Sequence, residues 1–191
     1  MRWFWIDRFV EFESGSRAVA IKNVASTEEQ LEGYFPGFPV MPAPLIIEGV
    51  AQTGGLLVAQ HSDFRERVVL AKVSKAVFHQ LARPGDTLRY TATVQSLQDR
   101  GAIVSGHSHI GETLQAEIDL FFAYLDERFD GKELFAPNEL LMVLRQLDVF
   151  EVGRNADGSR LTVPQYMSDA EQAAMVSGQS RKTAARGKLK T

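Results

Sequence analysis

The stretch "EGYFPGFPVMPAPLIIEGVAQTGGLL", residues 32–57, joins a proline-rich loop directly to an apolar helical segment. Prolines at positions 36, 39, 42 and 44 exclude regular structure up to about residue 43, although the first turn of a helix tolerates proline. We therefore predict one helix over residues 44–61, apolar nearly all round and hence buried. It contains one carboxylate, Glu48, and a charged group seldom lies in such surroundings without a partner or a task.

The polar and small residues of this helix fall on one face. Glu48, Gln52, Gly55 and Ala59 follow one another at spacings of four, three and four. Glycine costs a helix roughly 1 kcal/mol relative to alanine, but it lets another backbone approach closely. The pattern predicts a central helix wrapped by a sheet.

Segments that alternate with the period of a strand supply that sheet. They are residues 3–12, 17–24, 67–80, 86–98, 101–111 and 113–125. Turn sequences such as "ESGS", "ARPGD" and "DRG" separate them. We predict an α+β fold of the hot-dog type, in which about six antiparallel strands surround one helix.

The character of the chain changes after residue 126. We predict a helix over residues 136–152 with Asn138 as its cap, and a weaker helix over residues 161–177. The last fourteen residues hold five Lys or Arg and no acid, which predicts disorder. The division is a hot-dog domain (1–125), a helical appendage (126–177) and a basic disordered tail (178–191).

Composition excludes several classes of function. The chain has no cysteine, so disulfides and thiolate chemistry are excluded. An acidic body does not favour nucleic acid, and no apolar run reaches the ~18 residues of a membrane span. His107 and His109 have the spacing of metal ligands, but no Asp or Cys pattern accompanies them, and we expect no metal. We predict a cytoplasmic protein.

Glu48 and the helix start together suggest acid catalysis. Unpaired N–H groups and the positive end of the helix dipole suit a developing oxyanion. Apolar neighbours favour the protonated carboxyl, which is the form that a general acid needs. The alternative is a structural glutamate satisfied by Gln52 or by backbone donors.

The block "FPGFPVMP", followed at fixed spacing by "LIIE" and "AQ", resembles the bacterial 3-hydroxyacyl-ACP dehydratases of the FabZ/FabA type. The resemblance covers residues 3–125 and includes "RPGDTL". It implies a hot-dog homodimer, possibly assembled into hexamers. It also implies a hydro-lyase of fatty acid biosynthesis that needs no cofactor. Such an enzyme takes a (3R)-3-hydroxyacyl thioester from acyl carrier protein and forms the trans-2-enoyl thioester.

The same resemblance assigns the site residues. Glu48 matches the family acid, whereas Tyr34, fourteen residues earlier, stands where the family has its basic histidine. Tyrosine is almost wholly protonated at neutral pH and is therefore a poor base. The predicted substrate-binding residues are Phe35, Gly37, Phe38, Pro39, Ala43, Gln52 and Phe78.

Three hypotheses follow. The first is a dehydratase in which Tyr34 orders a water that acts as the base. The second is a non-catalytic acyl-thioester-binding subunit that forms a heteromer with a histidine-bearing paralogue. The third is a hot-dog thioesterase in which Glu48 activates water.

Overall fold

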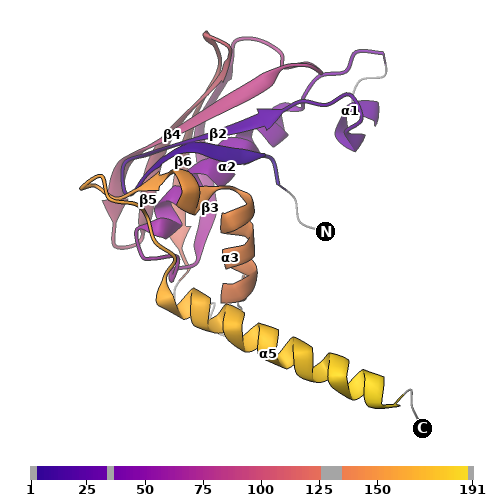
Figure 1. The fold of residues 1–191 in the computed structure, drawn as a ribbon. Helices are drawn as coiled ribbons and strands as arrows, with labels where there is room; N and C mark the ends of the chain where they lie inside the picture. Colours follow the sequence, from indigo (N-terminus) through magenta and orange to yellow (C-terminus); the bar gives the residue numbers. More distant parts are fainter. Residues whose placement is uncertain (1–3, 34–36, 126–134, 189–191) are drawn as a thin grey trace.

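The structure, a computed structural model, describes residues 4–33, 37–125 and 135–188 and shows a curved sheet around a central helix (Figure 1). The strands are β1 (Arg8–Glu13), β2 (Arg17–Asn23), β3 (Val68–Phe78), β4 (Thr87–Gln98), β5 (Gly101–Ile110), β6 (Thr113–Tyr124) and β7 (Gly153–Arg154). The helices are α1 (Glu29–Gly33), α2 (Ala43–Gln60), α3 (Pro137–Gln146), α4 (Val149–Val152) and α5 (Gln165–Lys188). Within the described residues we find no helix whose length and hydropathy suit a bilayer-spanning segment.

The strands form one sheet in the order β3-β6-β5-β4-β2-β1-β7. Neighbours are antiparallel except β1 and β7, which run parallel. The six predicted strands and the central helix are confirmed, and the short β7 was not predicted. β1 begins at Arg8 and not at residue 3, because the backbone N–H of Trp5 donates to the side chain of Gln52 and not to a neighbouring strand.

The core lies between α2 and the inner face of the sheet. Leu88, Tyr90 and Ala92, at alternate positions of β4, are fully buried there. A Cβ added to Gly49 of α2 would lie 2.4 Å from Cε2 of Tyr90 and 2.8 Å from the carbonyl oxygen of Trp5. The glycine therefore permits the close approach that the sequence predicts.

The C-terminal helices differ from their predicted limits. A single helix over 136–152 is wrong, because Asp148 adopts a left-handed conformation (φ 59°) and separates α3 from α4. Asn138 is not the cap: Ala136 occupies that position, and Pro137 begins the helix, as proline often does. Helix α5 continues to Lys188, past the predicted limit at residue 177 and into the segment predicted to be disordered. Alanine, glutamine, lysine and arginine in this segment are good helix formers.

Residues of the appendage share the core of the sheet. Leu141, Leu144 and Met167 are fully buried in the same apolar cluster as the strands. The N–H of Phe9 donates to the carbonyl of Leu147 over 2.9 Å, so β1 is bonded to the end of α3. Figure 1 shows α3 below the sheet and α5 leading away from the body of the molecule.

Candidate functional site

A pocket of about 760 Å³ runs along one face of α2. The α2 residues that line it are Glu48, Ala51, Gln52, Gly55, Leu56 and Ala59. All four residues of the predicted polar and small stripe are among them, and this confirms that they share a face. The pocket therefore sets Glu48 and Gln52 in a largely apolar lining, to which Arg65, Glu66 and Arg67 add charged groups.

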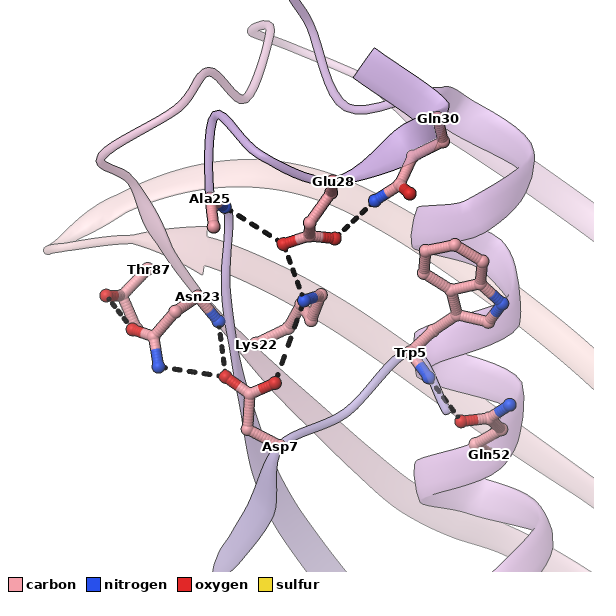
Figure 2. Close-up of polar contacts among 9 residues, drawn as sticks. All are labelled: Trp5, Asp7, Lys22, Asn23, Ala25, Glu28, Gln30, Gln52 and Thr87. Atoms are coloured by element: carbon pink, nitrogen blue, oxygen red, sulfur yellow. Dashed lines mark hydrogen bonds and ion pairs between the residues drawn. The ribbon is translucent and has the colours of Figure 1, made fainter. Parts of the chain in front are cut away.

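The side chain of Gln52 links Glu48 to the N-terminal segment. The N–H of Trp5 donates to Oε1 of Gln52 over 2.8 Å, a contact visible in Figure 2. A backbone N–H can donate to the oxygen of the Gln52 amide but not to its nitrogen, so this bond fixes which way the amide group points. The amide nitrogen Nε2 then donates to Oε1 of Glu48 over 3.0 Å. Because this bond engages Oε1 of Glu48, proton exchange with a ligand would fall to Oε2.

Tyr166 of α5 closes the C-terminal end of α2. Its hydroxyl donates to the carbonyl of Asp63 at 2.9 Å and lies 3.1 Å from the carbonyl of Phe64. Burial raises the pKa of Tyr166 and outweighs the opposing effect of Arg65, whose guanidinium lies 4.3 Å from the ring centre. Tyr166 is therefore a neutral donor that fastens α5 to the segment after α2, and it also lines the pocket.

The start of α2 offers one backbone donor. Pro42 precedes the helix and Pro44 lies in its first turn, so neither supplies an N–H. The N–H of Leu45 donates to the carbonyl of Pro42 over 3.0 Å. Ala43 is thus the first-turn residue whose N–H has no partner among the described residues, and it does not line the pocket.

The described residues of the proline-rich loop do not line the pocket. Gly37, Phe38 and Pro39 are exposed, and the guanidinium of Arg83 lies 4.7 Å from the ring centre of Phe38. Tyr34 and Phe35 lie outside the described residues. The structure thus brings Glu48 and Gln52 together, and it does not bring the described loop residues into this pocket.

Phe78 is also separate from the pocket. It ends β3 and is partly buried, whereas Val68 and Leu70, at the start of that strand, line the pocket. The prediction that Phe78 contacts substrate beside Glu48 finds no counterpart within the described protomer.

An ion cluster around the buried Lys22 supports the segment that leads toward the loop. The side chain of Lys22 is 10% exposed, and its Nζ lies 2.9 Å from Oε1 of Glu28 and 3.7 Å from Oδ1 of Asp7 (Figure 2). Burial alone would raise the pKa of Glu28, but the N–H of Ala25 and the charge of Lys22 outweigh it and lower that pKa. The cluster joins β2 to the chain just before α1.

None of the four histidines, all of them described, lines the pocket. Nε2 of His79 lies 3.0 Å from Oε1 of Glu117 on the exposed side of the sheet. The rings of His107 and His109 are 6.5 Å apart. Across the described ranges, no three potential ligands among His, Cys, Asp and Glu are grouped as a metal ion would require.

Two contributions to the pocket escaped sequence reasoning. Trp5 orients Gln52 from 47 residues away, and no local pattern signals that contact. Leu140, Val143 and Leu147 of α3 line the pocket, and their spacing of three and four residues was visible in the sequence as a helical face.

Comparison with known proteins gives concordant matches. Residues 3–112 match the family model described as "FabA-like domain". The 3-hydroxyacyl-[acyl-carrier-protein] dehydratase FabZ of Desulforamulus reducens is 40% identical over 62% of this chain and 84% of its own length. FabZ of Pelotomaculum thermopropionicum is 38% identical over 62% and 85%. Among solved structures, the dehydratase heterocomplex ApeI:P from Xenorhabdus doucetiae superposes with a TM-score of 0.55 over 73% of this chain and 88% of that chain, at 13% identity. The structural match supports the hot-dog fold alone.

Proposed function

Because the chain belongs to the FabA-like domain family, we propose that it is a FabZ-like 3-hydroxyacyl-ACP dehydratase, a hydro-lyase of fatty acid biosynthesis. It binds a (3R)-3-hydroxyacyl thioester carried by acyl carrier protein and eliminates water to form the trans-2-enoyl thioester. The curated relatives that bear this name support the proposal, since the chain covers 84% and 85% of two of them.

The observation that carries the proposal is the placement of Glu48. The carboxyl group lines an apolar pocket and is held through Oε1 by Gln52. With a proton on Oε2, Glu48 donates it to the departing hydroxyl and becomes a carboxylate that the Gln52 amide stabilises. In the hydration direction the same carboxylate removes a proton from water.

Removal of the α-proton and stabilisation of the enolate involve the start of α2 and Tyr34. The N–H of Ala43 polarises the thioester carbonyl and stabilises the enolate that forms when the α-proton leaves. Tyr34 holds a water molecule that accepts the α-proton, because the phenol itself is protonated at neutral pH.

The assembly that we propose is a homodimer joined along β3. That strand forms one end of the sheet, and its side chains Leu70, Val73 and Val77 are 38–39% exposed. A second copy would cover these side chains and satisfy the outer edge of the strand. The partner's loop would then reach the pocket, which the described loop residues of the same protomer do not enter.

The test is a dehydration assay on purified protein. 3-Hydroxybutyryl and crotonyl thioesters of acyl carrier protein are supplied, and the absorbance of the enoyl thioester is followed in both directions. Wild type, Glu48→Gln and Tyr34→His are compared. Glu117→Gln is the matched control, since it also removes a carboxylate, on the exposed side of the sheet.

We expect wild type and Glu117→Gln to turn over, and Glu48→Gln to lose activity by at least about 100-fold. Tyr34→His should accelerate the reaction. An inert wild type that gains activity as Tyr34→His would refute the dehydratase proposal and leave the acyl-binding subunit of a heteromer as the function. Release of free thiol without enoyl formation would indicate a thioesterase instead.

A further inference from the structure

The pocket beside Glu48 has a wall that the family match does not include. The match ends at residue 112, yet Leu140, Val143 and Leu147 of α3 line the same pocket as Glu48. These residues lie on one face of α3, at spacings of three and four. Part of the site is therefore built by the appendage.

This wall has the chemistry of a surface for a hydrocarbon chain. Its three side chains are aliphatic, and Leu140 is partly buried, so part of its surface remains open to a ligand. Val68, Leu70 and Phe122 of β3 and β6 also line the pocket and are apolar, whereas Arg65, Glu66 and Arg67 are the charged residues of this part of the lining. Burial of apolar surface is the main driving force available to a ligand here.

The wall is held rigidly. Leu141 and Leu144, which neighbour these residues on α3, are fully buried in the core of the sheet. The Phe9 N–H bonds to the carbonyl of Leu147, and Arg145 forms an ion pair with Glu171 of α5. A rigid wall limits the size of the ligand that fits in the pocket.

The polar end and the far end of the pocket are well separated. Glu48 and Ala59 both line it and stand eleven residues apart on α2, or about 16 Å at the rise of an α-helix. The reacting atoms must lie beside Glu48 and Gln52. The remainder of an acyl chain would therefore extend along the pocket, whose lining is mostly apolar apart from Arg65, Glu66 and Arg67.

We propose that α3, principally through Leu140, contacts the distal part of the acyl chain and sets the chain length that the protein accepts. The inference rests on the proposed acyl-thioester function and adds a specificity-determining residue from outside the family domain. A bulkier residue at position 140 excludes distal methylenes. Each excluded methylene lowers affinity by about fourfold, so the loss of three lowers it by about 60-fold.

The test measures binding of S-butyl-, S-octyl- and S-dodecyl-pantetheine, which have no thioester carbonyl and cannot react. The full-length chain is used as wild type, Leu140→Trp and Leu140→Ala, and titration calorimetry gives the affinities. Met142→Trp is the matched control, because Met142 lies on the same helix, is 55% exposed and does not line the pocket. Circular dichroism and gel filtration check the folding and oligomeric state of each variant.

We expect Leu140→Trp to weaken dodecyl binding by about 60-fold and to leave butyl binding unchanged. Leu140→Ala should retain butyl binding and improve dodecyl binding relative to octyl, and Met142→Trp should match wild type. An equal loss at all three lengths, or a change in oligomeric state, would overturn the inference, since α3 would then support an interface or the fold.

The outcomes also separate this inference from the proposed function. Length-dependent binding that changes with residue 140 in a protein without dehydratase activity supports the role of α3 and refutes the dehydratase assignment. Dehydratase activity whose chain-length profile is the same in wild type and Leu140→Trp supports the dehydratase assignment and refutes the role of α3. No binding of any pantetheine probe to wild type overturns the inference.

Discussion

Gly49→Ala tests whether close packing between α2 and the sheet controls both stability and the orientation of Glu48. The added methyl group would lie 2.4 Å from Cε2 of Tyr90, 2.8 Å from its Cζ and 2.8 Å from the carbonyl oxygen of Trp5. Tyr90 is fully buried and the Trp5 atom belongs to the backbone, so neither moves easily.

Two opposing effects determine how much Gly49→Ala changes the free energy of unfolding. Overpacking of a close-packed core costs about 1–3 kcal/mol, whereas alanine in place of glycine favours a helix by about 1 kcal/mol. Because the backbone oxygen of Trp5 cannot give way easily, the upper part of the overpacking range applies, about 2–3 kcal/mol, and the net expectation is a loss of about 1–2 kcal/mol in the free energy of unfolding. For a chain of this length, that corresponds to a fall in Tm of about 2–8 °C.

The assay is urea unfolding followed by tryptophan fluorescence, with a scanning calorimetry measurement of Tm. Gly55→Ala is the matched control on the same helix, since its new Cβ would meet only the ring edge of Phe122, at 3.2 Å. We expect the control to stay within about 0.5 kcal/mol of wild type, because the helix preference offsets the slight crowding. Gly49→Ala should also lower activity, since displacement of Trp5 removes its bond to Gln52. A Gly49→Ala protein at least as stable as wild type would refute the packing argument.

Three further substitutions test separate parts of the structure. Gln52→Leu removes the bonds of the side-chain amide to Trp5 and Glu48, so Glu48 loses its orientation. In a dehydration assay we expect kcat to fall by about tenfold with little change in KM, and an unchanged kcat would contradict this role. Glu28→Gln should lower the free energy of unfolding at pH 7 by about 1 kcal/mol. Since folding lowers the pKa of Glu28, its stabilisation is present above the unfolded-state pKa and is lost as pH falls through the folded-state pKa. The difference in the free energy of unfolding between wild type and Glu28→Gln should therefore be smaller in acid. Urea unfolding at pH 7 and pH 3 measures it, and equal differences at the two pH values would argue against a stabilising ion cluster. Asp148→Gly should raise the free energy of unfolding by about 0.5–1 kcal/mol, because φ is 59° there, and a lower Tm would show that the aspartate has a compensating contact.

The central helix and its polar face were predictable because their signals are local. The prolines before residue 45 limit where the helix starts, and α2 begins at Ala43, one residue from the prediction. The spacing of Glu48, Gln52, Gly55 and Ala59 defines a face whatever the surroundings, and all four line the pocket. Strand alternation likewise located six strands to within a few residues, apart from the start of β1.

The missed features depend on contacts between distant segments. Nothing near Trp5 in the sequence indicates that its N–H serves a side chain on α2 and not a strand. The break at Asp148 is equally hidden, because aspartate tolerates the left-handed region better than most residues but is usually found outside it. The contribution of α3 to the pocket is hidden as well, because it follows from the packing of Leu141 and Leu144 into the core.

The two ends of the sheet differ in a way that limits how far molecules of this kind can associate edge to edge. At one end, β7 pairs with β1 at Phe12 and Glu13, and the N–H groups of Phe9 and Ser14 donate to carbonyls of the appendage. The outer edge of β1 therefore has little hydrogen-bonding capacity left for another strand, whereas β3 at the other end remains available. In the homodimer that we propose, the two β3 edges would meet and the combined sheet would end in β7 on both sides. Edge-to-edge association of this kind would stop at two molecules and would not grow into a fibre.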